Sequence, residues 1–191
     1  ETRLNRDSRH EVCAVTLSGE IVRNQYCTRL EGEGADCHIT GLYLNDGDRL
    51  IDNALEITHV RPHCSSRIEC KGILDDQSKA VFTGKIYVHP QAQKTDSRQL
   101  NNNLLLSDRA TIDTKPQLEI YADDVKCTHG ATVGAPPDEV IFYFRSRGIG
   151  EDTARAMLTR GFAAEVLDEI PIGPVRDRLL QLVYDRYKAD R

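Results

Sequence analysis

The sequence has none of the features that mark membrane proteins, secreted proteins and nucleic-acid-binding proteins. No apolar run approaches the roughly 20 residues that cross a bilayer, and no segment resembles a secretory signal peptide. Lys and Arg form no basic cluster, and the formal net charge is −5 among 191 residues. Because phosphate binding needs clustered cations, we expect a partner other than nucleic acid, and no membrane contact.

The sequence is also poor in methionine and in paired cysteines. It begins at Glu1 and its single methionine is Met157, so we expect it to be part of a longer protein. No cysteine belongs to a CxxC pair, which argues against a zinc site or a thioredoxin-like site. Without a secretory signal we expect reduced thiols, as in the cytoplasm or, in a plastid-bearing organism, the stroma. The six cysteines are Cys13, Cys27, Cys37, Cys64, Cys70 and Cys127.

Short runs of β-branched and aromatic residues fill the chain up to Pro136-Pro137. Turn-forming residues separate the runs, a pattern typical of an all-β protein. We find no strict repeat, and Asp46-Gly47 is the main two-residue hairpin signal, so a sandwich and a solenoid both stay open, with the solenoid slightly favoured. The predicted strands are Val12–Leu17, Ile21–Leu30, His38–Leu44, Leu55–Val60, Ile68–Leu74, Val81–Val88, Leu104–Leu106, Gln117–Tyr121 and Ala131–Val133.

The pattern after Pro137 is helical, so we predict a β domain over 1–135 and a helical domain over 136–191. A short helix or turn is expected around Phe142, and the next helix over Glu151–Arg160, ended by Gly161. Phe162–Ile170 follows as a separate short helix, and Pro174 opens the last one. Apolar residues of the last helix fall on one face: Val175, Leu179, Leu182, Val183 and Tyr187.

The densest polar motif contains Cys127 and His129. On a strand, residues two apart point to the same face, so a thiol and an imidazole would lie side by side. Such a pair suits iron and other soft or borderline metals, or nucleophilic catalysis, although ordinary packing explains many such pairs. An iron–sulfur cluster normally needs four protein ligands, so a cluster here would need a second chain and would sit at an interface.

Other polar groups are assigned to structure rather than to chemistry. His59, His63 and Cys64 have a spacing that suits a metal on a helix, but this stretch predicts a strand followed by a turn at Pro62. We find no nucleophile elbow, Walker A loop or dinucleotide fingerprint. Three further groups are expected at turns or on the surface: Asp75-Asp76, Asp123-Asp124, and Asn101-Asn102-Asn103, which we expect to stack at a solenoid turn.

A set of motifs lies in order between about Ala54 and Ile170. The segments are Phe82–Val88, Ala92–Asp96, Gln99–Ser107, Pro116–Ile120, Ala122–Cys127, His129–Gly134, Phe142–Phe144 and Ser146–Ile149. Together they resemble the SufB/SufD family of iron–sulfur cluster assembly proteins. SufB proteins typically carry Glu after the motif histidine, whereas Gly130 follows His129 here and Cys127 precedes it, which resembles the SufD branch.

The resemblance implies a right-handed parallel β-helix followed by a small helical C-terminal domain. It implies a non-catalytic scaffold that pairs with SufB, or with a second copy when isolated. His129, and with less certainty of role Cys127, match family positions near the SufB–SufD interface, where a nascent cluster forms transiently. No cofactor is expected in the isolated chain, and the sequence leaves open whether the assembly binds a flavin. SufD proteins normally carry a helical region and more β-helix before this segment.

The resemblance also implies that the helical domain binds SufC, an ABC-type ATPase, whose motion would reach the SufB–SufD interface. The residues expected to contact SufC are Phe142, Phe144, Met157, Leu158, Leu179 and Val183. A SufB-type paralogue is the first alternative. A β-helix enzyme acting on carbohydrates is the second, but it would need clustered carboxylates or a histidine in a groove, which we do not find outside the Cys127 region. A purely structural module is the third.

Overall fold

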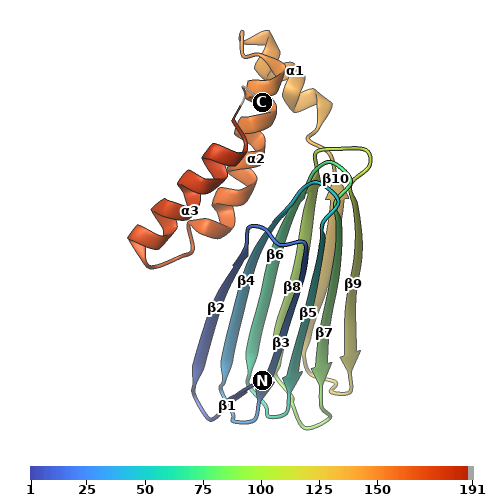
Figure 1. Ribbon diagram of the computed structural model, residues 1–191. Helices are drawn as coiled ribbons and strands as arrows, with labels where there is room; N and C mark the ends of the chain where they lie inside the picture. Colours follow the sequence, from blue (N-terminus) through green and yellow to red (C-terminus); the bar gives the residue numbers. More distant parts are fainter. Residues whose placement is uncertain (189–191) are drawn as a thin grey trace.

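The computed structural model describes residues 1–188 and is mainly β (Figure 1). Two five-stranded sheets face each other, and three helices follow at one end of the strands (Figure 1). Residues 189–191, the last three of the predicted helical domain, lie outside the described residues. The last strand ends at Gly134 and the first helix begins at Asp138.

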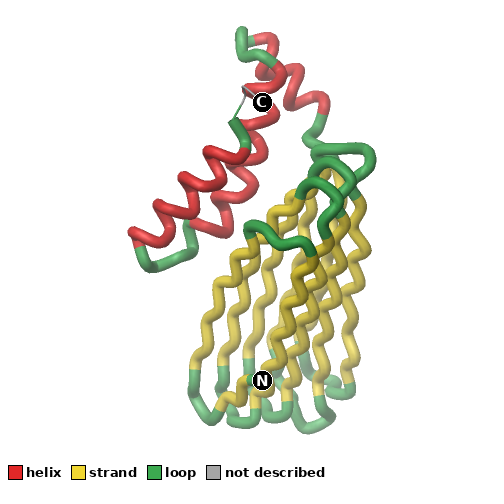
Figure 2. Tube along the Cα trace, viewed as in Figure 1, coloured by secondary structure: helices red, strands yellow, loops and turns green. Residues whose placement is uncertain are grey.

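The chain alternates between the two sheets, so that each sheet takes every second strand. The strands lie side by side along the β-helix, with the helices outside it (Figure 2). Every pairing is parallel, which excludes the antiparallel sandwich and confirms a parallel β-helix. One sheet contains β1 (Thr2–Leu4), β3 (Ile21–Leu30), β5 (Leu50–His59), β7 (Lys79–Val88) and β9 (Thr111–Ile120). The other contains β2 (Arg9–Thr16), β4 (Asp36–Asn45), β6 (Ser65–Leu74), β8 (Asp96–Leu105) and β10 (Lys126–Gly134).

The strand register reveals a repeat that the sequence pattern did not. Ile21 pairs with Leu50 and Leu50 with Lys79, so successive partners are 29 residues apart. In the other sheet, Asp96 follows its partner Ser65 by 31 residues. The sequence shows no strict repeat because turns of different length shift successive coils by a few residues.

The core lies between the two sheets and is filled from both sides. Alternate residues point inward, as the period of two along a strand requires. Full burial of each large apolar side chain is worth roughly 1.5–3 kcal/mol. The largest fully buried side chains of this core are Phe82, Leu30, Ile39, Ile51, Ile57, Ile68, Leu74 and Ile86.

Polar residues fill the inward positions of β8, and here two predictions fail. Asn101 and Asn103 are buried inside the β-helix, not stacked at a turn. They form a hydrogen-bonded cluster with Tyr43: Asn101 Nδ2 donates to Tyr43 Oη at 3.0 Å, and Asn103 Nδ2 to Asn101 Oδ1 at 2.8 Å. The strand begins at Asp96, well before the predicted start at Leu104. The prediction missed its first part because polar inward residues hide the alternation of the strand.

The three helices are α1 (Asp138–Ser146), α2 (Glu151–Leu167) and α3 (Gly173–Arg186). The predicted break at Gly161 was wrong, since α2 runs through it as one helix. A glycine inside a helix costs about 1 kcal/mol relative to alanine. Burial of Ala163, Val166 and Leu167 beyond it offsets that cost.

The C-terminal helices pack on the outside of the β-helix, beside β2 and β4 (Figure 1). Helix α2 contacts β4 and β6, and its apolar residues join Leu42, Leu44 and Ile73 in a second core. All six cysteines are free thiols. Among the described helices, none is long and apolar enough to span a membrane.

Candidate functional site

The last coil of the β-helix is open on one side. Strands β9 and β10 are the outermost strands of their sheets, and each pairs with only one neighbour. Strand β10 pairs with β8, which places Cys127 beside Ser97 and His129 beside Gln99. Paired residues of neighbouring parallel strands lie about 4.8 Å apart and point to the same face.

Cys127 and His129 both point to the interior side of this open coil. Their partners Ser97 and Gln99 are inward-facing and almost fully buried. No coil of the described chain follows β10, so Cys127 is only half-buried and His129 is exposed. The predicted common face is therefore confirmed, with the two Cα atoms about 6.6 Å apart along the strand.

The surroundings of Cys127 disfavour its thiolate. Partial burial raises the pKa of the Cys127 thiol, and the nearby carboxylate of Asp96 raises it further, while the backbone of Ser97 opposes the rise. The thiol is therefore protonated at neutral pH in the isolated chain. A metal bound here would have to displace that proton.

A hydrogen-bonded chain lies in the layer below Cys127. His59 Nε2 and Ser66 Oγ are 2.8 Å apart, and Ser66 Oγ lies 2.8 Å from Ser97 Oγ. Burial lowers the pKa of His59 to about 4, so its imidazole is neutral at pH 7. These hydrogen bonds fix the position of Ser97, which is the residue paired with Cys127 on the neighbouring strand.

The open end is apolar around the two polar residues. Ile120 is 38 % exposed and Val133 47 % exposed, although both occupy inward positions of the last coil. Ile112 and Leu118 are partly buried and continue the core toward this end. Two unpaired strand edges beside an exposed apolar surface are features that proteins normally cover.

The described chain brings two side chains that are able to bind a metal to this end, not a complete metal site. Within residues 1–188, no group of three or more His, Cys, Asp or Glu side chains could hold a metal ion. Among the described residues, none forms a side-chain hydrogen bond or ion pair with the His129 imidazole, so this ring is available. His59 lies buried in β5, His63 occupies a turn, and Cys64 is buried.

The six residues predicted to contact an ATPase divide into two groups. Phe142 and Met157 are 71 % and 43 % exposed. Phe144 and Leu158 are partly exposed. Val183, only 2 % exposed, and the partly buried Leu179 belong instead to the apolar cluster that α3 shares with α2, β4 and β6.

Sequence reasoning missed other exposed apolar residues of the helices. Tyr143, beside Phe142, is 54 % exposed. The run from Ile141 to Phe144 was the available signal, because one helix face cannot bury four consecutive large residues. The others are Ile172, Val175 and Tyr184.

Comparison with known proteins identifies the family of the chain. Residues 1–162 match the family model described as SUF system FeS cluster assembly, SufBD core domain. The chain belongs to the SufB/SufD family. It is 42 % identical over 170 residues to the iron–sulfur cluster assembly protein SufD of Escherichia coli K12, which covers 89 % of the chain and 40 % of that relative.

Two further relatives show how widely the family sequence is shared. An iron–sulfur cluster assembly SufBD family protein of Mycobacterium leprae is 36 % identical over 188 residues, covering 94 % of the chain and 48 % of the relative. The chloroplastic protein ABCI7 of Arabidopsis thaliana is 34 % identical over 177 residues, covering 92 % and 37 %. The chain thus spans less than half the length of these SufB/SufD relatives.

Proposed function

We propose that this chain is a scaffold part of the iron–sulfur cluster assembly machinery and carries no catalytic centre of its own. Membership of the SufB/SufD family supports a role in iron–sulfur cluster assembly. The observation that carries the site is the inward-facing pair Cys127 and His129 on a coil that nothing in the described chain covers. His129 serves as a ligand to a nascent cluster, and Cys127 as a second sulfur ligand or a neighbour of the cluster.

The partner at this end is a SufB-type chain. A cluster normally needs four protein ligands, so two must come from the other side of an interface. A second β-helix can pair with the free edges of β9 and β10 and cover Ile120 and Val133. When SufB is absent, a second copy of this chain takes its place. The cluster is transient cargo, and any flavin belongs to the whole assembly, in the cytoplasm or the plastid stroma.

The helical segment is the contact for a SufC-type ATPase. Helix α1 packs on α2, whereas the main helical contacts with the β-helix come from α2. Phe142 on α1 and Met157 on α2 are exposed apolar residues, and the partly exposed Phe144 and Leu158 extend this surface. Leu179 and Val183 act indirectly, because they hold α3 in the apolar cluster that it shares with α2, β4 and β6.

Light scattering after size exclusion, on the purified chain mixed with the cognate SufC-type ATPase, tests the helical contact. We expect a defined complex that is lost in Phe142→Asp and kept in Ile172→Asp. Ile172 is a matched control because it is 60 % exposed but lies at the turn between α2 and α3. Binding that survives Phe142→Asp would place the ATPase contact elsewhere, and no binding by the folded wild-type chain would remove this part of the proposal.

A further inference from the structure

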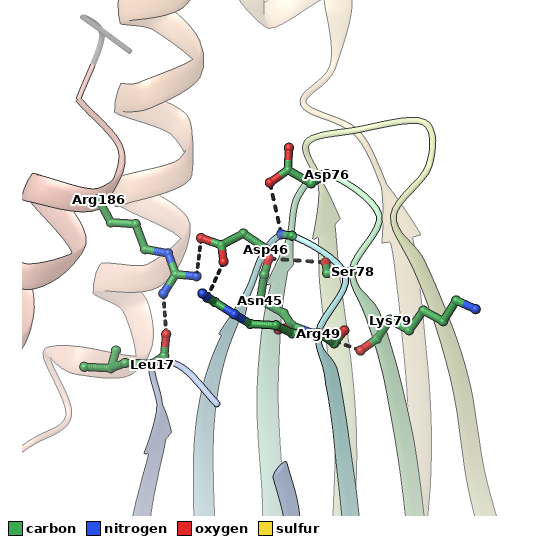
Figure 3. A network of polar contacts seen from close by, with 9 residues as sticks. Leu17, Asn45, Asp46, Arg49, Asp76, Ser78, Lys79 and Arg186 are labelled. Carbon is green, nitrogen blue, oxygen red and sulfur yellow. Dashed lines mark hydrogen bonds and ion pairs between the residues drawn. The ribbon is translucent and has the colours of Figure 1, made fainter. Parts of the chain in front are cut away.

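One arginine joins the end of the last helix to two turns of the β-helix (Figure 3). Arg186 Nη2 lies 2.7 Å from Asp46 Oδ2, in the turn after β4. Its Nη1 donates to the carbonyl oxygen of Leu17, just after β2. The Arg186 side chain is 15 % exposed and that of Asp46 26 %, so this pair is much less hydrated than an ordinary surface pair.

The turn that receives Arg186 is itself fixed to the next turn (Figure 3). The Gly47 amide donates to Asp76 Oδ2 at 3.0 Å, and Asn45 Nδ2 donates to the Lys79 carbonyl at 2.9 Å. Ser78 Oγ donates in turn to the Asn45 carbonyl. The Thr111 amide, at the start of β9, donates to the Ser78 carbonyl at 3.0 Å. Hydrogen bonds therefore run from Arg186, turn by turn, to an edge strand of the open coil.

The other polar contacts between helices and β-helix are weaker candidates for such a fastening. Lys71 pairs with Glu165, but that carboxylate is 70 % exposed, and the hydrogen bond from Lys71 Nζ to the Phe162 carbonyl is long at 3.4 Å. His38 Nε2 lies 3.9 Å from Glu169, which is 40 % exposed. Exposed ion pairs contribute little because water and salt screen them.

We propose that Arg186 is the clasp that fixes the helical segment on the β-helix and passes its movements to the turns. The clasp itself follows from the contacts alone. Its use, to carry the motion of a bound ATPase toward β9 and the open coil, rests on the proposed function.

The clasp has an asymmetry that makes it testable. Asp46 also accepts from Arg49, so removing Arg186 leaves Asp46 paired and no charge isolated. Removing the Asp46 charge instead leaves two guanidinium groups close together without their shared anion. Loss of one partner of a partly buried ion pair costs more stability when it leaves the other charge without a counter-ion. Asp46→Asn should therefore loosen α3 more than Arg186→Ala does.

Hydrogen exchange of the whole chain, followed by mass spectrometry, measures this loosening directly. In Arg186→Ala we expect amides of α3 to exchange about tenfold faster, as for loss of one charge-assisted bond, with β4 and β6 unchanged. Arg176→Ala is the control, since Arg176 lies in the first turn of α3 and pairs with the exposed Asp177. Arg186→Lys keeps the charge but not the two-pronged contact, so its α3 exchange rate should lie between those of the wild type and Arg186→Ala.

Two further results decide the matter. The α3 amides should exchange faster in Asp46→Asn than in Arg186→Ala. In the double variant, Asp46→Asn with Arg186→Ala, the exchange rate should return toward that of Arg186→Ala. Equal α3 exchange in Arg186→Ala, Arg176→Ala and the wild type would overturn the clasp.

The coupling role has its own readout. Arg186→Ala should still bind the ATPase by light scattering but lose most ATP-dependent cluster maturation. Normal maturation in a variant whose α3 exchanges faster would overturn the coupling. Failure of the wild-type chain to bind the ATPase would instead count against the proposed function, and the exchange result would still decide the clasp.

Discussion

Strands β8 and β10 are neighbours whose inward positions are paired but differ in burial. In β8 the inward residues Ser97, Gln99, Asn101 and Asn103 are all buried and lie within a closed interior. In β10 the paired residues Cys127, His129, Ala131 and Val133 are half-buried or exposed. Polar groups that stabilise a closed coil thus become available for ligand binding where the coil is open.

The same comparison separates the cysteines. Burial raises the pKa of Cys37 to about 11 and that of Cys70 to about 12, so both thiols are inert. Cys127 shares their inward direction but keeps access to solvent at the open end. Position along the β-helix, not the residue type, decides which thiol can react.

The largest expected effect compares two glycines. An alanine methyl group at Gly72 would overlap the Tyr43 ring and approach Asn103, inside the closed coils. Gly72→Ala should lower the free energy of unfolding by about 3 kcal/mol. Gly134, at the end of β10, has open space around it, so Gly134→Ala should change stability by less than about 0.5 kcal/mol. Urea denaturation measures both, and equal losses would contradict the contrast between the closed coils and the open β10.

Buried His59 predicts a loss of stability in acid. Its folded pKa of about 4 lies below the ordinary value of 6.5, so the unfolded chain takes up the proton first. The stability is complete above pH 6.5 and falls as the pH drops toward 4, by up to about 3 kcal/mol. His59→Leu should flatten this part of the pH profile, and the turn variant His63→Asn should not. A wild-type slope in His59→Leu would show that His59 is not the group responsible.

Two valines compare a covered surface with an uncovered one. Val183→Ala removes two methyl groups from the packed core under α3 and should cost about 2 kcal/mol. Val133→Ala, on the open coil, should cost less than about 0.5 kcal/mol in the isolated chain. Thermal unfolding of both variants checks the difference. A large cost at Val133 without a partner would mean that the open end is already covered, for example by a second copy.

The smallest effect concerns thiol labelling. Iodoacetamide at pH 8, followed by peptide mass spectrometry, should modify exposed Cys13 and half-buried Cys127 while Cys37 and Cys70 stay unmodified. Addition of the SufB-type partner should protect Cys127 and leave Cys13 reactive. Unchanged labelling of Cys127 in the complex would place the interface away from the open coil.

The sequence predicts most strands and the shared face of Cys127 and His129, because both depend on local periodicity. It fails at β8, where Ser97, Gln99, Asn101 and Asn103 replace the apolar residues that periodicity detects. It fails at Gly161, where packing of α2 outweighs a weak local preference. The openness of β10 and the pairing of Arg186 with Asp46, 140 residues apart, depend on topology and have no local signal.

The most direct test of the central claim is the absorption spectrum of the anaerobically reconstituted complex between this protein and its SufB-type partner. The wild-type complex should show iron–sulfur charge-transfer bands, and so should the control His63→Asn. His129→Ala should form the same complex, with the same stability, and lose these bands. An unchanged cluster spectrum in His129→Ala would contradict the assignment of the open coil as the cluster site.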